Sequence, residues 1–410
     1  MQVKQPEFTL PNNRLTKIPK GKQKQVEYIS DYNKKSWMYN PDDEKFLFGI
    51  PNPYIVPDHR YFREFFYWDS FYILLGLLLY KDTKNLCSGI LQNFASEVKR
   101  FGRIPNSNAY YSLSRSQSPY FAIAIQEYLK VYPEDLDSVW MQQCVDMAIE
   151  EYEFYWLGTD KRYADHLTPT GLSRYWDLHD DADIFSEYES GWDTTSRFRG
   201  ECLMTLPIDL NSQLAMYERF FSWWFTQKKD SEKAQKWKAA SEKRFELITA
   251  YCWDEKERIF FDYNYVKSTK TGFVSAASFF PFYAQIATED QAKKSLPVLL
   301  AKLECEGGIV NTQKVSAGAS LKNQWDHPLG WAPLNYVAYM ALKNYGFKED
   351  ADRIKAKWLA VCDYWFEQDE CFYEKYDVVK VGRKIKCLTP ARVGFGWTNS
   401  IYLNFILNEI

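Results

Sequence analysis

The chain has 410 residues, with 51 Lys and Arg against 54 Asp and Glu, and an aromatic content of 18%. This length is enough for one large core or for two domains. A formal net charge of −3 offers no basic surface for nucleic acid and no polybasic segment for an anionic membrane. We therefore expect neither partner, and we expect most aromatic rings to build a core.

The eight cysteines include no Cys-x-x-Cys pair, and no histidine lies near them at zinc-finger spacing. Cysteines within predicted helices are typical of free, buried thiols. Residues 1–6 lack the apolar core of a signal peptide. The most apolar run, residues 72–80, is far shorter than the ~20 residues that span a bilayer, and it predicts a helix buried on all sides. These features predict a soluble, cytoplasmic protein in a reducing compartment, with no metal site.

Residues 1–56 are rich in Lys, Asn, Gln and Pro and show weak periodicity, which predicts an N-terminal extended arm. In residues 57–410, apolar residues recur at helical spacing and no low-complexity linker divides the chain. This part is expected to form one helical catalytic domain. The predicted helices span residues 68–81, 85–101, 118–131, 136–157, 209–227, 230–252, 274–287, 290–304, 331–345, 348–367 and 397–408.

Boundary residues support several of these helices. Gly102 follows two basic residues, as at a helix end, and Thr288 precedes two acidic residues, as at a helix start. The strand signal is weak, with one short hairpin arm expected at residues 259–263. Long connections tend to carry function, and the four expected here are residues 102–117, 158–208, 305–330 and 368–396.

Four separated segments combine aromatic rings with carboxylates, amides and glycine. Secondary-structure propensity does not explain these segments, because Pro and Gly interrupt helices and strands alike. A sugar ring does, because its apolar faces stack on aromatic rings while its hydroxyls bind carboxylates and amides. If alternate loops of a closed ring of helices meet at one mouth, the segments predict a single sugar site. They are residues 65–69, 190–193, 324–333 and 394–399.

Other chemistries lack their signatures. None of the four histidines pairs with another at metal-ligand spacing. The Gly-Phe-Gly sequence at residues 394–396 lacks the third glycine and the preceding strand of a phosphate-binding loop. No nucleophile-elbow motif is present.

Carboxylates beside tryptophan are better candidates for catalysis. Glycoside hydrolysis needs one carboxylic acid and one carboxylate, and apolar neighbours raise the pKa of the acid. Asp193, which follows Trp192, suits the acid, and Glu374 suits its partner. By residue type alone Asp69 and Asp326, which also follow tryptophans, are equally good candidates, and an Asp at a helix start is more often a cap.

The order of the motifs separates these candidates, because it resembles the trehalase family of glycoside hydrolases. In chain order the motifs resemble the family's first signature, two parts of its substrate-binding loop, its acid motif, its second signature, its base motif and its C-terminal motif. The resemblance covers roughly residues 57 to 408. The matching segments are residues 57–70, 104–108, 114–117, 190–193, 324–333, 374–377 and 394–399.

The resemblance implies an all-α fold, the (α/α)6 toroid, as a single domain with long loops at one mouth. It implies inverting hydrolysis of an α-glucoside, with trehalose as the leading substrate and no metal or cofactor. Asp193 would be the general acid and Glu374 the general base. The residues implied to bind the sugar or form the site wall are Arg60, Phe62, Trp68, Asp69, Asn106, Arg115, Ser116, Gln117, Gly191, Trp192, Trp325, Asp326 and Trp397.

The chain departs from the family pattern on the side that holds the leaving-group sugar. The first signature lacks its glycines and has one extra residue. Residues 180–189 replace an Arg-Pro-Glu element, and residues 380–392 replace a Gly-rich loop with a basic one that contains Lys384, Lys386 and Arg392. Lost hydrogen bonds to a substrate hydroxyl weaken transition-state binding. The alternative function is therefore an α-glucosidase with another leaving group, such as glucosylglycerol, glucosylglycerate or another disaccharide. A further alternative, an inactive sugar sensor, is disfavoured by the presence of both carboxylates.

Overall fold

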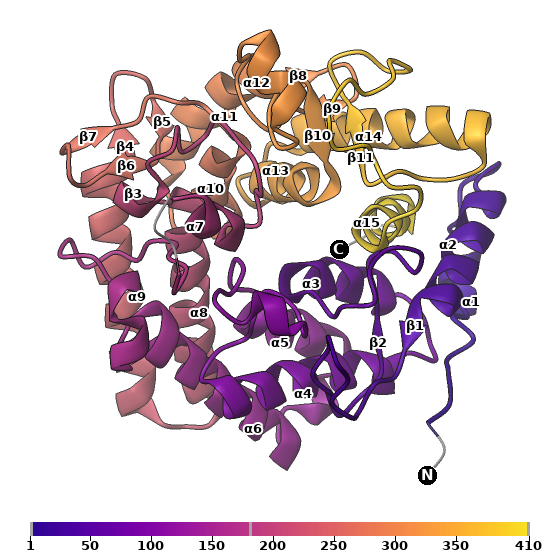
Figure 1. Ribbon diagram of the computed structural model, residues 1–410, viewed down its shortest axis with the longest axis horizontal. Coiled ribbons are helices and arrows are strands. Elements are labelled where there is room, and N and C mark those ends of the chain that lie inside the picture. The colour runs from indigo at the N-terminus through magenta and orange to yellow at the C-terminus, as the bar shows by residue number, and fades with distance from the viewer. Residues whose placement is uncertain (1–2, 180–182, 408–410) are drawn as a thin grey trace. The chain divides into compact units, whose positions relative to one another are not determined.

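A computed structural model of the protein describes residues 3–179 and 183–407, and the chain is mostly helical (Figure 1). It divides into two compact units. The first comprises Met1–Ala148, Leu359–Tyr376 and Ala391–Ile410, and the second comprises Ile149–Trp358 and Asp377–Pro390. Each unit is described by itself.

Two fully buried helices form the core of the first unit. Every residue of α3 (Tyr67–Leu77) and of α15 (Gly396–Leu407) is buried, and the two helices pack against each other (Figure 1). Glycines allow this close approach, because a Cβ at Gly76 would lie 2.5 Å from the Ser400 hydroxyl and a Cβ at Gly396 would lie 2.5 Å from α3. The apolar run at residues 72–80 is thus buried, as predicted.

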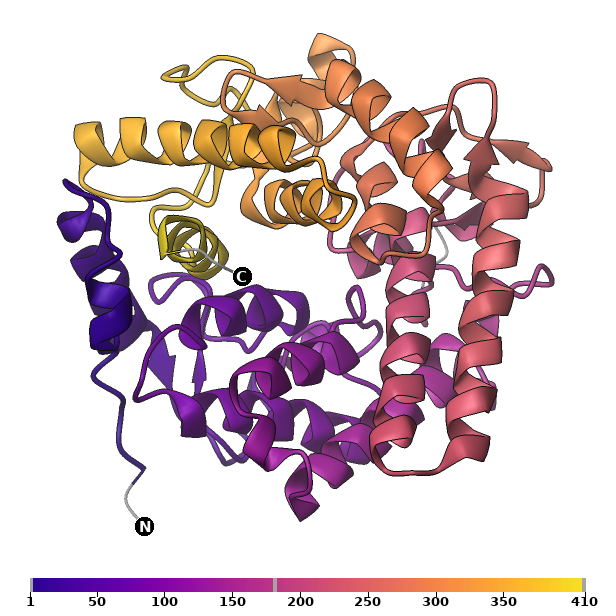
Figure 2. The same ribbon diagram turned by 180° about the vertical axis from the view of Figure 1, so that it is seen from behind.

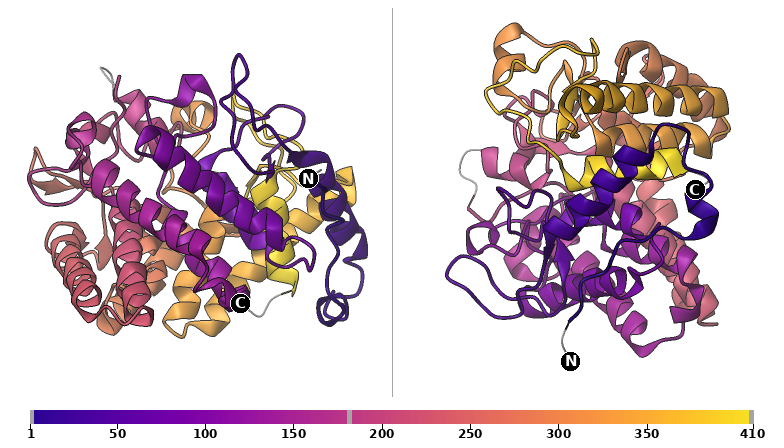
Figure 3. Two further views of the ribbon diagram at one scale, coloured as in Figure 1. Left: turned by 90° about the horizontal axis from the view of Figure 1, so that it is seen from below. Right: turned by 90° about the vertical axis from the view of Figure 1, so that its right-hand side faces the viewer.

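Other helices of the first unit pack around this pair. α4 (Lys84–Phe101) and α5 (Phe121–Val131) contact α3, and α2 (Gln23–Ser36) contacts α15 (Figure 3). The positive φ of 74° at Gly102 ends α4, as predicted. The remaining elements that lie in or begin in this unit are α1 (Asn12–Leu15), the antiparallel strands β1 (Trp37–Met38) and β2 (Tyr54–Ile55), the 3-10 turns Tyr110–Ser112 and Pro133–Asp135, α6 (Val139–Glu150) and β11 (Lys375–Asp377).

The N-terminal segment is not extended throughout, contrary to the prediction for residues 1–56. Helix α2 runs for 14 residues and buries Val26, Ile29 and Tyr32. These three residues recur at a spacing of three, which places them on one face. The sequence signal is weak because lysines and other polar residues separate the few apolar positions. The boundary at residue 56 stays a prediction.

The second unit is built on the helix pair α8 (Ile208–Gln227) and α9 (Ser231–Cys252), which lie side by side (Figure 2). Asp230 caps α9 by accepting a hydrogen bond from the backbone N–H of Lys233 at 3.0 Å. α10 (Phe280–Tyr283) contacts both α8 and α13 (Ala332–Asn344). The other helices are α7 (Ile184–Glu189), α11 (Glu289–Leu303), α12 (Ala317–Lys322) and α14 (Lys348–Asp369), which continues into the first unit; short 3-10 or π turns span Glu151–Trp156, Lys161–His166, Cys202–Met204 and Ala276–Phe279.

The strands of the second unit are two or three residues long. They form antiparallel pairs and one three-stranded sheet in the order β3-β6-β7, and the expected hairpin arm at residues 259–263 lies within them. Their bounds are β3 (Thr205–Leu206), β4 (Trp253–Asp254), β5 (Ile259–Phe260), β6 (Tyr263–Asn264), β7 (Thr269–Lys270), β8 (Glu304–Cys305), β9 (Gly308–Ile309) and β10 (Leu329–Trp331).

Helices predicted from the sequence are found within a few residues of their expected bounds, including α11, whose Thr288 forms a capping box with Gln291. Two predictions are corrected in detail. The helix expected at 136–157 changes to π geometry after residue 150, and the one expected at 274–287 is a 3-10 turn followed by the four-residue α10. Helices α1, α2, α7 and α12 were not predicted.

All eight cysteines are free thiols, and six of them are buried. Within the described residues, no helix combines the length and the apolar content that crossing a membrane requires.

The close approach of α3 and α15 makes Gly76 intolerant of a side chain. In Gly76→Ala the new methyl group would also lie 2.6 Å from the Cβ of Ser400, so the helices must separate. We expect the free energy of unfolding to fall by about 1–3 kcal/mol, the usual cost of overpacking. Urea titration followed by circular dichroism measures this change.

Gly318→Ala is the matched control, because Gly318 lies within α12 and a Cβ there meets no atom within 4 Å. Alanine has the higher helix propensity, so this substitution should leave stability unchanged or raise it by up to about 1 kcal/mol. Equal stability of the Gly76 variant and the wild type would contradict the packing described here.

Candidate active site

The candidate acid, Asp193, lies on a tight loop of the second unit directly after α7. Gly191 has φ +76°, a left-handed conformation that favours glycine. The Ser190 hydroxyl accepts a hydrogen bond from the backbone N–H of Trp192 at 3.0 Å. Asp193 is half-buried, and its carboxylate accepts a hydrogen bond from the Gln324 side-chain amide at 3.0 Å. The loop therefore presents this carboxyl group in a fixed direction.

The carboxylate of Asp326 ties the acid loop to the segment that follows α12. Asp326 is fully buried and accepts hydrogen bonds from the Thr195 hydroxyl at 3.0 Å and from the Ser196 backbone N–H and hydroxyl at 2.8 and 2.6 Å. It also accepts one from the Asn323 side-chain amide at 2.9 Å. Asp326 is thus a structural anchor, and its oxygens are occupied by protein donors.

Three tryptophans form the apolar part of this site. Trp325 and Trp331 are stacked with ring centroids 4.0 Å apart, and Trp192 lies 5.6 Å from Trp325. The Trp331 indole N–H donates to the Gln324 carbonyl at 2.9 Å, which fixes the residue that binds Asp193. All three rings are buried, so they act as the wall behind the acid loop.

A buried arginine supports the face of Trp192. The Arg197 guanidinium lies 4.8 Å from the centroid of that ring, and it is held by two buried carboxylates. It donates to Asp209 at 2.6 and 2.7 Å and to Asp262 at 2.7 and 2.8 Å. This bidentate pairing satisfies a charge that would otherwise be costly to bury.

Two further carboxyl groups lie on α7, just before the loop. Glu189 is buried and accepts hydrogen bonds from the Tyr155 hydroxyl and from the Trp176 backbone N–H at 2.7 Å, and His166 Nε2 lies 3.1 Å from it. Glu187 accepts from the Thr195 backbone N–H at 2.8 Å. The pKa of Glu187 is raised to about 8, chiefly by burial and in part by the nearby carboxylates of Asp326 and Asp193, while the hydrogen bond from Thr195 lowers it.

The candidate base, Glu374, is a buried residue of the first unit that directly precedes β11. Its carboxylate lies 3.2 Å from the ammonium group of Lys375, which is itself fully buried. Its backbone N–H donates to the Arg392 carbonyl at 2.9 Å, and its carbonyl accepts from the Trp397 indole at 3.2 Å. Burial raises the pKa of Glu374, while Lys375 and the Arg392 hydrogen bond lower it in part.

Aromatic rings of the first unit gather near the segment that carries Glu374. Trp397 lies edge-to-face against Trp68 at 5.7 Å and at a tilt to Phe395 at 4.5 Å, and Phe62 lies 6.4 Å from Phe395. The Arg392 guanidinium lies 5.8 Å from the Phe62 ring. These contacts bring together predicted site residues from the first signature and the C-terminal motif.

The predicted substrate-binding loop forms many internal hydrogen bonds. Gln117 accepts one from the Trp68 backbone N–H at 3.1 Å, and the Ser116 hydroxyl donates to the Ile104 carbonyl at 2.6 Å. The Asn106 amide donates to the Ser116 carbonyl at 3.3 Å, and its backbone N–H donates to the Arg115 carbonyl at 2.9 Å. These residues therefore shape the loop around the start of α3.

Arg60 and Asp69 differ in exposure. The Arg60 side chain is exposed and donates to the buried Asp58 at 3.2 Å. Asp69 is buried in the first turn of α3.

The structure thus brings the predicted residues together in two sets, one in each unit. Residues 180–182 of the loop before the acid motif lie outside the described residues.

Several residues that support the site were not predicted. They are Gln324, Glu187, Glu189, Arg197 and Lys375. Gln324 and Lys375 lie inside motifs that the sequence analysis recognised, so their positions carried a usable signal. Glu187, Glu189 and Arg197 carried no such signal, because the burial of a charged side chain depends on partners that are distant in the sequence.

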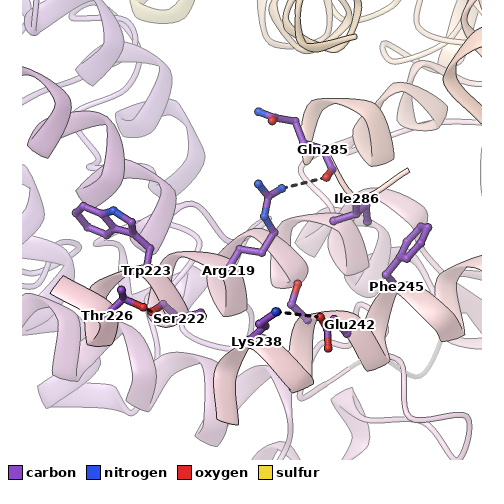
Figure 4. Close-up of a pocket in the computed structure, with 10 residues that line it drawn as sticks. Arg219, Ser222, Trp223, Thr226, Lys238, Glu242, Phe245, Gln285 and Ile286 are labelled. Carbon is purple, nitrogen blue, oxygen red and sulfur yellow. Dashed lines mark hydrogen bonds and ion pairs between the residues drawn. The ribbon is translucent and has the colours of Figure 1, made fainter. Parts of the chain in front are cut away.

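Two further observations concern a cavity outside the candidate site and the question of a metal ion. A cavity of about 440 Å³ between α8, α9 and residues 285–286 is lined by residues that include Arg219 and Trp223, and by none of the predicted site residues (Figure 4). Among residues 3–179 and 183–407, no group of three His, Cys, Asp or Glu side chains is arranged to hold a metal ion.

Known proteins resemble this chain along nearly all of its length. The sequence model of the trehalase family matches residues 13–187 and 175–409. The periplasmic trehalase of Shigella flexneri serotype 5b is 31% identical over 443 aligned positions, which cover 97% of this chain and 76% of that protein. A putative periplasmic trehalase of Escherichia coli O157:H7 is also 31% identical, with 97% and 77% covered.

Solved structures give the fold class. The neutral trehalase Nth1 from Saccharomyces cerevisiae matches with a TM-score of 0.76 and 29% identity, covering 95% of this chain and 80% of that one. The GH63 mannosylglycerate hydrolase from Thermus thermophilus matches with a TM-score of 0.62 at 17% identity, covering 86% and 95%, which indicates a shared fold alone. These matches confirm the predicted all-α, (α/α)6 class.

The raised pKa of Glu187 predicts a pH dependence of stability. The pKa of Glu187 is about 8 in the folded protein and near its ordinary value of 4.5 in the unfolded chain, so the folded state holds one more proton between these pH values. This contribution to stability is fully present below about pH 4.5 and is lost as pH rises through about 8. The side chain of Glu187→Gln stays neutral at every pH. Between pH 5 and 8.5 its free energy of unfolding should therefore fall by on the order of 2–4 kcal/mol less than that of the wild type, as measured by urea unfolding.

Glu306→Gln is the control, since Glu306 is an exposed carboxyl group of the same unit. It should keep the wild-type slope of stability against pH. The same slope in the Glu187 variant would show that Glu187 is ionised in the folded protein at neutral pH.

Proposed function

We propose that this chain, which belongs to the trehalase family, is an inverting glycoside hydrolase that cleaves trehalose into two glucose molecules. The match to trehalases over 97% of the chain carries the proposal. The local environments of the two candidate carboxyl groups support it, because each has the surroundings that its role requires.

In this proposal Asp193 is the general acid. An acid must deliver its proton to the glycosidic oxygen in one direction, which requires a positioned carboxyl group. The left-handed turn at Gly191 and the hydrogen bond from Gln324 supply that position. The buried tryptophans form an apolar wall behind the loop.

Glu374 is the general base in the same proposal. In an inverting enzyme the base removes a proton from a water molecule that attacks the anomeric carbon on the face opposite the leaving group. Burial makes a Glu374 carboxylate more basic, while the adjacent ammonium group of Lys375 keeps it ionised over more of the pH range. A base with a pKa closer to the working pH is the more effective catalyst.

The remaining predicted residues are proposed as the sugar site. Aromatic rings would stack on the apolar faces of glucose, and polar side chains would bind its hydroxyls. The residues are Arg60, Phe62, Trp68, Asp69, Asn106, Arg115, Ser116, Gln117, Gly191, Trp192, Trp325 and Trp397, with Asp326 in a supporting role. Residues 57–410 are the proposed catalytic domain, and residues 1–56 the proposed N-terminal arm.

We propose a reducing compartment, the cytoplasm, because all eight cysteines are free thiols. The curated relatives reported above are named as periplasmic trehalases, so their names do not support this compartment. Fractionation of the source cells followed by immunoblotting tests it, and recovery of the protein outside the cytoplasm would refute it.

Removal of either carboxyl group should nearly abolish activity. We expect Asp193→Asn and Glu374→Gln each to lower turnover of trehalose by at least about 10²–10⁴-fold, the usual contribution of positioned acid–base catalysis. Substrate binding should change less, because other residues provide most contacts to the sugar. Glucose release measures turnover, and proton NMR of the first products should show β-glucose and α-glucose in equal amounts, because inversion changes only the attacked glucose and the leaving glucose keeps its α configuration.

An Asp69→Asn variant tests the assignment against a buried carboxyl group that is not proposed to transfer protons. It should reduce activity mainly through binding. First formation of α-glucose alone, without an equal amount of β-glucose, or full activity of the Asp193 or Glu374 variant, would refute the mechanism. Glucose release from glucosylglycerol, glucosylglycerate or kojibiose but not from trehalose would refute the substrate and leave the mechanism intact.

The acidic limb of the pH–activity profile should report Glu374. Because Lys375 lowers the pKa of Glu374, Lys375→Gln should raise that pKa and move the acidic limb to higher pH. The comparison uses kcat/KM for trehalose from pH 4 to 9. Lys380→Gln removes an exposed cation five residues further on and should leave the limb in place. An unshifted limb in the Lys375 variant would show that Glu374 is not the base.

A further inference from the structure

The second unit contains a cavity of about 450 Å³ next to the segment that binds the acid loop. Three stretches of chain line it: residues 314–321, 327–329 and 377–387. Its volume is within the range of small-molecule sites, about 300–1,000 Å³. The mechanism proposed above uses none of the residues that line it.

The lining of this cavity is strongly cationic. It contains Lys314, Arg383, Lys384 and Lys386 against one carboxylate, Asp377. Arg383 and Asp377 neutralise each other, because the guanidinium donates two hydrogen bonds to that carboxylate, one of them at 2.9 Å. Asp377 also accepts from two backbone N–H groups at 3.1 Å, so it has little capacity left for another cation.

Three lysines of the cavity remain without a carboxylate partner. Within the part of the chain that the structure describes, Lys314, Lys384 and Lys386 form no ion pair. Cations that line one cavity without counter-charges repel one another, and a bound anion would relieve that repulsion.

Hydrogen bonds hold the walls of the cavity to one another. The backbone N–H of Leu388 donates to the Leu321 carbonyl at 2.9 Å. The Ser320 hydroxyl donates to the His327 carbonyl at 2.7 Å, and the Val378 N–H donates to the Pro328 carbonyl at 3.1 Å. The lysine-bearing loop is therefore attached to the other two stretches, and the cavity does not need to form on binding.

We propose that this cavity binds a small phosphomonoester. Three ammonium groups balance a phosphate of charge about −1.5 to −2 better than they balance a single carboxylate. Lysine binds phosphate as a point charge, and the arginine that lines the cavity is already paired. A cavity of about 450 Å³ exceeds the size of phosphate alone, so the ligand carries a polar body such as a sugar.

The cavity is also connected to the loop of the candidate acid, through Asp326. His327, in its wall, follows Asp326, which anchors Thr195 and Ser196 of the acid loop. A phosphomonoester could therefore be part of the substrate or a separate effector. Binding itself does not depend on trehalose hydrolysis, so it can be tested even if the proposed function is wrong.

Isothermal titration calorimetry of the full chain with glucose 6-phosphate tests the proposal. We expect saturable binding that weakens with added salt, and no comparable binding of glucose. The double variant Lys384→Gln, Lys386→Gln should bind glucose 6-phosphate at least about tenfold more weakly, because each loses a charge-assisted contact. The control double variant Lys322→Gln, Lys380→Gln removes the same charge from neighbouring exposed positions outside the cavity and should bind as the wild type does.

Two activity measurements separate the sources of the phosphate. Faster cleavage of trehalose 6-phosphate than of trehalose, lost in the Lys384, Lys386 variant, would place the phosphate on the substrate. A change in KM for trehalose when glucose 6-phosphate is added, lost in the same variant, would place it on an effector. The proposal is overturned if glucose 6-phosphate binds no better than glucose, if glycerate binds as tightly, or if both double variants weaken binding equally.

Discussion

The buried carboxylate of Asp326 is the interaction on which the candidate acid depends. It gathers hydrogen bonds from Thr195, Ser196 and Asn323, residues from two loops about 130 positions apart in the chain. Two further hydrogen bonds join the same loops, from the Gln324 backbone N–H to the Thr194 hydroxyl and from the Trp325 backbone N–H to the Thr194 carbonyl, both at 3.1 Å, so Asp326 and Thr194 together bring Gln324 to Asp193. A buried carboxylate with several donors is costly to leave partly satisfied, so the arrangement is all-or-none. Hydrogen bonding thus sets the direction of the candidate acid, which the tryptophans alone would not orient.

The sequence predicts the helices well where apolar periodicity is strong and less well where it is interrupted. α3 and α15 are largely apolar around their whole circumference, and a run of such residues is a reliable sign of a buried helix. α2 was missed because its buried face is carried by few apolar residues among many lysines. The helix expected from residue 136 begins later, because Asp135 and its neighbours form a 3-10 turn. Helix α6 begins at Val139 after Ser138, whose hydroxyl accepts from the backbone N–H of Met141. Local caps compete within a few residues, and tertiary packing decides among them.

The candidate site was proposed from the order of its motifs, because the chemistry of single residues did not distinguish its members. Composition and spacing left Asp69, Asp193, Asp326 and Glu374 equivalent, and only the order of the motifs favoured two of them. The structure separates Asp326 on physical grounds, since its oxygens are saturated by protein donors while Asp193 is half-buried. Glu187 was invisible in the sequence, because its raised pKa arises from burial and from carboxylates that reach it only in the folded chain. Hydrogen-bond networks between distant segments are the part that residue patterns do not encode.

The contact between α3 and α15 also limits the order in which the two units can fold during synthesis. The Ser400 hydroxyl lies 3.4 Å from the Ile73 carbonyl, 327 positions away in the chain. During synthesis, α3 therefore exists for most of the chain's production without the helix that covers it, and its apolar surface is exposed. The second unit, drawn mostly from one continuous stretch, can assemble earlier. A ribosome that stalls late in synthesis would release a chain whose second unit can fold but whose α3, in the first unit, still lacks α15. Exposed apolar surface of this kind is bound by chaperones.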